Sequence, residues 1–310
     1  MGEGENIIKP PALRPGDTVG VVAPAATVER AHLERGVSAL IAMGYRVKVS
    51  ARALERSGIL AGDNATRAAE LTAFFADPEV KAIFAARGGY GSGRLLPIID
   101  FPMLARTPKI FLGFSDETYL LNALVARCRM VAFHGPMVAM DFSHGVSTPA
   151  RDHLTRLLAG EARGFSLEAR SALRPGAAQG VLIGGCLSVI VAMIGTPWEP
   201  LFDGRILFLE DTGEKAYRID RMLTQLLQAG ILNRLAGLVF GAIRPIEGSG
   251  REGELIRDFI GEATAQLECP VLSGIEAGHG TANFALPLGL TARIDAAERR
   301  LIFTEAAVTA

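Results

Sequence analysis

Residues 17–50 read DTVGVVAPAATVERAHLERGVSALIAMGYRVKVS, and they carry the strongest fold signal in the chain. The run 17–23 follows a Pro-Gly turn and is apolar from Val19 onward, which is typical of a buried parallel strand. A helix is expected over 28–43, where Thr27 can cap its first turn. The run 45–50 predicts the next strand, so the stretch is expected to form a strand–helix–strand unit of a parallel sheet.

The same alternation continues through the first half of the chain. Further strands are expected over 82–87, 109–114 and 130–133, and further helices over 64–75, 116–127 and 149–159. Strands that alternate with helices of this length predict an α/β fold with a Rossmann-like parallel sheet.

The length of 310 residues exceeds the ~250–300 residues at which a single core stops growing, so two domains are expected. We expect a Rossmann-like N-terminal domain over 1–160 and a loop-like linker over 161–180. A smaller, mixed α/β, β-rich and barrel-like C-terminal domain is expected over 181–310. Within it, helices are expected over 186–194, 215–229 and 252–267, and strands over 206–210, 238–242, 290–295 and 300–304.

Composition excludes several classes of protein. Lys and Arg number 32 against 33 Asp and Glu, so the chain lacks the basic excess that nucleic-acid binding normally needs. The longest apolar stretch, 181–194, is shorter than the ~18 residues of a membrane span. Three cysteines without CxxC spacing indicate buried thiols rather than disulfides or a zinc site. A cytoplasmic enzyme with no membrane partner is therefore expected.

In an open parallel sheet, ligands bind outside the carboxyl ends of the strands. The first candidate there is the loop GGYGSG, residues 88–93, which follows an expected strand. The loop fits neither GxGxxG nor a phosphate loop, which ends in Lys-Ser/Thr. It either exposes backbone N–H groups to an oxyanion or carboxylate, or is a plain tight turn.

The second candidate is Ser115, within GFSDE (113–117). A serine at a strand-to-helix turn exposes its Oγ, and the next backbone N–H can stabilise an oxyanion. The GxSxG consensus is absent, because Glu117 replaces the last glycine. The alternative is that Ser115 is an ordinary N-cap.

A serine nucleophile needs an imidazole base, and the base needs an acid to orient it. Of five histidines, His279 lies between two glycines that leave its ring unobstructed, and His134 at a strand end is the rival base. Glu210 closes the apolar run 206–210 and is the candidate acid, with a structural ion pair as its alternative.

The sequence resembles the LD-carboxypeptidases, also called muramoyltetrapeptide carboxypeptidases, a serine peptidase family. The resemblance covers nearly the whole chain. It rests on six segments in order: ARGGYGSGRLLP (86–97), GFSD (113–116), FHGP (133–136), LIGGCLS (182–188), LEDTGEKAYRIDR (209–221) and GHG (278–280).

The resemblance implies a cytoplasmic hydrolase of peptidoglycan recycling that releases terminal D-Ala from murein tetrapeptide. By position, it implies that Ser115 is the nucleophile, His279 the general base and Glu210 the acid. The backbone N–H groups of Asp116 and Gly89 are then the oxyanion donors. The family implies a homodimer, and neither a cofactor nor a metal is expected.

Four further residues are candidates for substrate contact. Gly88, Arg87 and Arg94 belong to the glycine loop or flank it, and an arginine could bind the free carboxylate of a carboxypeptidase substrate. Cys186 stands where relatives usually carry Asn, which puts any contact made by that amide in doubt.

Two other functions are open. An immunity-type relative would hydrolyse aminoacyl-nucleotide amides with the same triad. Such relatives tend to stack the nucleotide base on an aromatic side chain, and Trp198 is the sole Trp here. A non-enzymatic protein would bind a small ligand with two α/β lobes, and Ser115 would then be only a helix cap.

Overall fold

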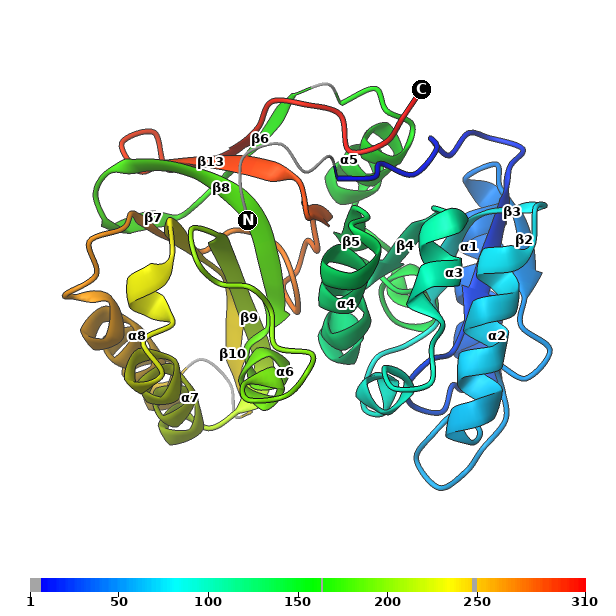
Figure 1. Cartoon of the computed structure of the whole chain (residues 1–310), viewed down its shortest axis with the longest axis horizontal. Coiled ribbons are helices and arrows are strands. Elements are labelled where there is room, and N and C mark those ends of the chain that lie inside the picture. The colour runs from blue at the N-terminus through cyan, green and yellow to red at the C-terminus, as the bar shows by residue number, and fades with distance from the viewer. Residues whose placement is uncertain (1–6, 163, 247–249) are drawn as a thin grey trace. The chain divides into compact units, whose positions relative to one another are not determined.

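The computed structural model describes residues 7–162, 164–246 and 250–310, and the chain divides into two units. Unit 1 comprises Met1–Arg163, Asn283–Gly289 and Ala306–Ala310, and unit 2 comprises Gly164–Ala282 and Leu290–Glu305. The chain therefore returns to unit 1 twice after residue 282, which the expected boundaries do not include. Figure 1 shows the helices and strands of each unit.

Unit 1 is built on a six-stranded sheet with the order β12-β5-β4-β3-β1-β2. Its elements are β1 (Thr18–Val22), α1 (Arg30–Ala42), β2 (Arg46–Val49), α2 (Asn64–Ala76), β3 (Val80–Ala85), η1 (Ser92–Leu95), α3 (Phe101–Arg106), β4 (Ile110–Gly113), η2 (Ser115–Glu117), α4 (Thr118–Cys128), β5 (Ala132–His134), η3 (Val138–Phe142), α5 (Thr148–Leu158) and β12 (Leu286–Leu288). The first five strands run parallel, and β12 pairs antiparallel with β5. The predicted Rossmann-like sheet is confirmed.

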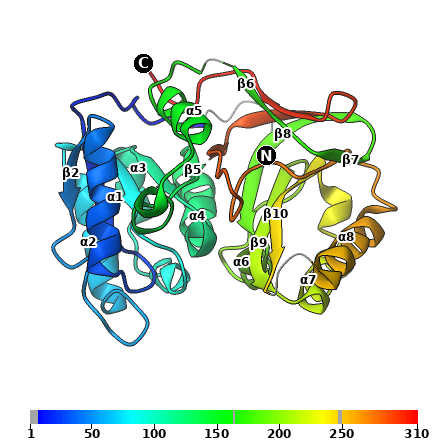
Figure 2. The same cartoon turned by 180° about the vertical axis from the view of Figure 1, so that it is seen from behind.

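The central strands β1 and β4 are almost wholly apolar because helices cover both faces of the sheet, whereas the edge strand β2 is largely exposed. Every residue of β1 and β4 is buried. Figures 1 and 2 show α2, α3 and α4 on one face and α1 on the other. The start of α2 is capped by Asp63, whose carboxylate accepts from the Thr66 N–H at 2.8 Å.

Strand order reverses between β1 and β3 in unit 1, and this switch point is where open α/β sheets bind ligands. The glycine loop 88–93 follows β3, and Ser115 follows the neighbouring strand β4. Both sequence candidates of unit 1 therefore lie at the carboxyl edge of adjacent strands.

Unit 2 contains an eight-stranded sheet with the order β6-β14-β13-β8-β9-β10-β11-β7. Its elements are β6 (Phe165–Glu168), β7 (Ser171–Arg174), β8 (Ala177–Cys186), α6 (Leu187–Met193), β9 (Ile206–Glu214), α7 (Ala216–Gln228), η4 (Leu232–Arg234), β10 (Gly237–Pro245), α8 (Arg251–Thr264), β11 (Val271–Ser273), β13 (Thr291–Asp295) and β14 (Arg300–Phe303). Strands β8 to β11 are parallel, and the remaining pairs are antiparallel. The expected mixed, β-rich architecture is confirmed.

Two strands of this sheet lie in the segment expected to be a linker. β6 pairs with β14, and β7 pairs with β11, so residues 165–174 belong to the sheet at its two ends. Their backbone groups are satisfied by strands from distant parts of the chain, which local sequence does not reveal. Among the described residues β6 and β7 do not pair with each other, so the barrel-like closure stays a prediction.

The described residues contain no helix that is both long and apolar enough to cross a membrane. The cysteines Cys128, Cys186 and Cys269 form no disulfide within the described part of the chain, and the first two are buried.

Candidate active site

Ser115 occupies a strained turn at the end of β4. Its φ is 62°, in the left-handed region that few residues other than glycine adopt. Such a conformation costs about 1–3 kcal/mol and persists where surrounding structure imposes it, often at functional sites. The capping residues are Phe114 for η2 and Glu117 for α4, so Ser115 is not the N-cap that we considered as the alternative.

The glycine loop lies directly against this serine. A Cβ placed on Gly88 would be 2.9 Å from Ser115 Cβ, 3.1 Å from Ser115 Oγ and 3.2 Å from the Asp116 backbone nitrogen. Only a hydrogen atom fits there without displacing the serine, so Gly88 permits the close approach of the two segments. The backbone of the loop and the N–H of Asp116 therefore border the same hydroxyl.

The loop is tied to the serine turn by Ser92 and Asp116. The Ser92 N–H donates to the Asp116 carboxylate at 2.7 Å, and the Ser92 hydroxyl donates to the Asp116 carbonyl at 2.6 Å. The buried guanidinium of Arg67 donates to the carbonyls of Gly91, at 2.9 Å, and Pro24. These bonds hold the loop in one position relative to Ser115.

Sequence reasoning missed both Ser92 and Arg67 as supporting residues. A signal for Arg67 was present, because it shares the buried face of α2 with Leu71 and Phe74 at helical spacing. A charged residue on such a face is seldom buried unless its charged group is paired or hydrogen-bonded.

Two buried carboxyl groups, those of Asp116 and Glu117, belong to the serine turn itself. Burial raises the pKa of Asp116, and the Ser92 hydrogen bonds oppose that rise. Burial also raises the pKa of the fully buried Glu117 well above its ordinary value, with a smaller contribution from the charge of Asp116, while the Arg67 guanidinium opposes it. Burial therefore favours the neutral form of Glu117 over its charged form.

In unit 2, Glu210 and His279 form a hydrogen-bonded pair. His279 Nδ1 lies 2.7 Å from Glu210 Oε2, and the His279 backbone N–H donates to the same oxygen at 3.0 Å. Glu210 is completely buried in β9, whereas 18% of the His279 side chain is exposed. An ionised carboxylate only accepts hydrogen bonds, so Nδ1 carries the ring proton and Nε2 keeps its lone pair. This is the arrangement that a general base needs.

Gly278 makes room for this pair. Its φ is 87°, and a Cβ placed on it would overlap the carboxyl group of Glu210. A Cβ on Gly280 would meet its nearest atom, Ala242 Cβ, at 3.5 Å, which is an ordinary contact. The first glycine of GHG is therefore required by packing and the second is not.

Cys186 is the register partner of Glu210 across β8 and β9. Its Sγ lies 3.3 Å from Ser188 Oγ, and the Ser188 N–H donates to Asp211 at 2.8 Å. Burial raises the pKa of the Cys186 thiol well above its ordinary value, and the charges of Glu210 and Asp211 add to the rise. The thiol is therefore protonated and a poor nucleophile.

The other predicted residues have local partners in unit 1. Arg87 donates to the Thr27 carbonyl at 3.0 Å, and the Arg94 guanidinium lies 5.3 Å from the centroid of the Tyr90 ring. His134, the rival base, is completely buried, with its ring 5.7 Å from that of Phe114. Within the described part of the chain, no group of three or more His, Cys, Asp or Glu could hold a metal ion.

The structure thus brings the predicted residues together in two groups. Unit 1 carries Ser115, with Asp116 and the glycine loop beside it, and unit 2 carries the Glu210–His279 pair, with Cys186 adjacent to Glu210.

Comparison with known proteins gives the family. Residues 19–135 match the LD-carboxypeptidase N-terminal domain, and residues 179–294 match the LD-carboxypeptidase C-terminal domain. The chain is 37% identical to a Bacillus subtilis protein named "Probable murein peptide carboxypeptidase", over 95% of this chain and 93% of the other. It is 26% identical to the microcin C7 self-immunity protein MccF of Escherichia coli, over 94% of each chain.

A solved structure agrees with these matches. The crystal structure of muramoyltetrapeptide carboxypeptidase from Oxalobacter formigenes is similar with a TM-score of 0.83 at 30% identity, covering 92% of this chain and 97% of the other. The chain therefore belongs to the LD-carboxypeptidase family, and it is an enzyme of the serine-type carboxypeptidase class.

Proposed function

We propose that this enzyme hydrolyses the LD-peptide bond that releases terminal D-Ala from murein tetrapeptide, in cytoplasmic peptidoglycan recycling. The observation that carries the proposal is the Glu210–His279 hydrogen bond, which places the ring proton on Nδ1 and the basic lone pair on Nε2. Ser115, which lies in a strained turn beside Gly88 and is not a helix cap, supplies the hydroxyl nucleophile that such a base would activate. The identity to the murein peptide carboxypeptidase, 37%, exceeds the identity to MccF, 26%, and favours a peptide substrate.

In the proposed mechanism, His279 Nε2 removes the proton of Ser115 as Oγ attacks the scissile carbonyl carbon. The N–H groups of Asp116 and Gly89 would stabilise the resulting oxyanion, and each such donor lowers the barrier by about 3 kcal/mol in comparable sites. D-Ala leaves with the proton from His279, and an acyl-enzyme remains on Ser115. Water, deprotonated by His279, then releases the tripeptide and restores the serine.

The mechanism requires the Ser115 hydroxyl and His279 Nε2 to come within hydrogen-bond distance in the active enzyme. The proposed division of labour assigns the nucleophile and oxyanion donors to the N-terminal domain and the acid and base to the C-terminal domain. We also propose a homodimer as the working form, which sedimentation analysis of the purified protein would test.

Mass spectrometry after incubation with defined murein tri-, tetra- and pentapeptides tests the reaction. The expected result is loss of one alanine from the tetrapeptide alone, with no loss in the Ser115→Ala variant. Preferential cleavage of an aminoacyl-nucleotide amide would instead assign the immunity-type activity. A serine-directed phosphonate should label Ser115 in the wild type, and an unlabelled serine would contradict the acyl-enzyme.

A further inference from the structure

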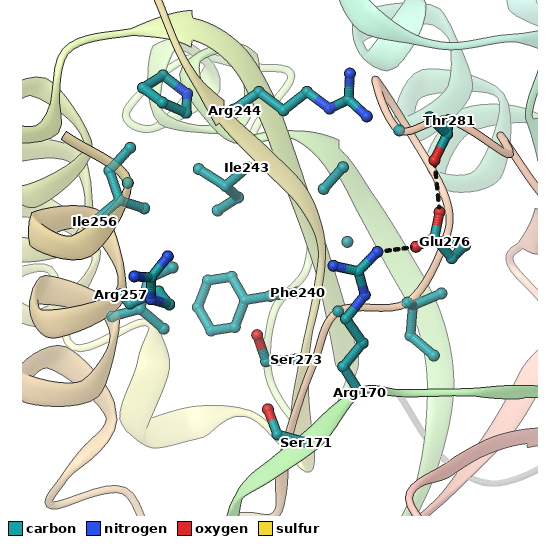
Figure 3. Close-up of a pocket in the computed structure, with 18 of the residues that line it drawn as sticks. Arg170, Ser171, Phe240, Ile243, Arg244, Ile256, Arg257, Ser273, Glu276 and Thr281 are labelled. Atoms are coloured by element: carbon teal, nitrogen blue, oxygen red, sulfur yellow. Dashed lines mark hydrogen bonds and ion pairs between the residues drawn. The ribbon is translucent and has the colours of Figure 1, made fainter. Parts of the chain in front are cut away.

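Unit 2 contains a pocket of about 640 Å³ between β10, α8 and the segment that carries His279 (Figure 3). Its volume lies within the range of small-molecule binding sites, ~300–1,000 Å³. None of the residues predicted from sequence lines it, and the mechanism above uses none of its side chains.

The wall of this pocket is apolar on the side of the sheet and helix. Phe240 and Ile243 of β10 and Ile256 and Ile260 of α8 line it, and Figure 3 shows the Phe240 ring near its middle. Such a surface binds the methylene and methyl groups of a ligand rather than a fully hydrated ion.

The same pocket is bordered by arginines in excess of acids. Arg170, Arg244 and Arg257 line it, with Glu254 and Glu276 as its carboxylates. Arg170 forms an ion pair with Glu276. Arg244 and Arg257 have no ion-pair partner in the part of the chain that the structure describes, so two guanidinium groups remain for a ligand. Planar guanidinium groups bind carboxylates with two parallel hydrogen bonds.

The pocket adjoins the proposed base directly along the chain. Glu276 and Thr281 both line it, and they stand on either side of His279 in sequence. The Thr281 hydroxyl donates to Glu276 Oε2 at 3.4 Å, and Arg170 pairs with the other oxygen of Glu276 (Figure 3). A ligand in the pocket would therefore touch the segment that holds the catalytic imidazole.

We propose that this pocket binds the acidic peptide segment on the amino-terminal side of the cleaved bond, with Arg244 or Arg257, which lie on opposite sides of the pocket (Figure 3), binding its free carboxylate. The inference rests on the proposed function, because it assigns a subsite for that substrate. The departing D-Ala is too small to fill the pocket, whereas the remaining peptide offers both alkyl groups and the free α-carboxylate of its γ-linked D-glutamyl residue. Ser171 and Ser273 supply hydroxyls for its peptide groups.

Paired substrates and a double variant test the subsite. The tetrapeptide is prepared with the D-glutamyl α-carboxylate free or amidated, and both are assayed with wild type and with Arg244→Gln/Arg257→Gln. We expect the variant to raise KM for the acidic peptide about tenfold or more, with kcat retained, and to leave KM for the amidated peptide nearly unchanged. The wild-type KM for the acidic peptide should also rise with salt more steeply than that of the variant.

A matched control is Arg300→Gln, an exposed arginine of unit 2 outside the pocket that donates to Ser166 Oγ at 2.7 Å. It should leave both KM values unchanged, and thermal melting checks that each variant folds. An unchanged KM ratio in the double variant, or a loss in kcat instead of KM, would overturn the subsite while leaving the proposed function intact. A wild-type enzyme that cleaves only aminoacyl-nucleotide amides would overturn the proposed function, and the peptide subsite with it.

Discussion

His279 Nδ1 lies 2.7 Å from Glu210 Oε2, although 69 residues separate the two in sequence. The same oxygen accepts the His279 backbone N–H, so one buried carboxylate orients both the ring and the main chain. This double contact distinguishes His279 from His134, whose ring lies buried against Phe114.

We therefore expect His279→Ala to lower kcat by about 10³-fold or more, because no other group would take the serine proton. Glu210→Gln should produce a loss of similar size, since an amide does not stabilise the required tautomer or the imidazolium. Steady-state hydrolysis of murein tetrapeptide provides the measurement. His134→Ala should cost much less activity, and the reverse order of the two histidine variants would overturn the assignment of the base.

Gly278→Ala should inactivate the enzyme nearly as fully as Glu210→Gln. The added methyl group would overlap the Glu210 carboxyl group, and alanine is disfavoured at a φ of 87°. Gly280→Ala is the matched variant, and its loss of kcat should be much smaller because its Cβ would make only an ordinary contact with Ala242. Equal losses in the two variants would mean that the overlap at Gly278 is not the cause.

Glu117→Gln should stabilise the protein at neutral pH. Burial raises the folded-state pKa of Glu117 well above 4.5, so the folded protein binds this proton more tightly than the unfolded chain. Stability contributed by the protonated group is thus present below pH ~4.5 and is lost as pH rises toward the folded-state pKa. Glutamine does not ionise, so the variant does not lose this stability as the pH rises.

The melting temperature of Glu117→Gln minus that of wild type should accordingly grow with pH above ~4.5. Glu79→Gln, at an exposed glutamate of the same unit, should show no such trend. A difference that is constant with pH would contradict the raised pKa of Glu117.

Alkylation should separate the serine mechanism from a thiol mechanism. Cys128 and Cys186 are buried, and burial raises the pKa of the first to about 12 and that of the second well above its ordinary value. Both should resist iodoacetamide at pH 8 in the folded protein, while the half-buried Cys269 reacts faster. Peptide mapping gives the extent at each thiol, and activity that is lost in step with rapid alkylation of Cys186 would argue for a thiol nucleophile.

Much of the parallel sheet could be predicted because its signals are local. Mostly apolar runs such as 17–23 and 109–114 mark strands that are buried on both faces, and they correspond to β1 and β4. Because Ser115 directly follows the second of these runs, its place at the carboxyl edge of the sheet could be predicted as well. Strands β6, β7 and β12 could not be predicted in this way, because they are short and pair with segments distant in sequence.

For the candidate site, the amino-acid sequence by itself determined which side chains could carry the chemistry. These are a serine after a buried strand, a histidine between glycines and a glutamate at the end of an apolar run. They could be identified because residue type and short-range pattern depend only on neighbouring positions in the sequence. The tertiary structure alone decided that Ser115 adopts a left-handed φ, that Glu210 binds His279, and that Arg244 and Arg257 share a pocket. Contacts of this kind depend on how strands of high sequence separation pair and pack, and no local periodicity encodes that pairing.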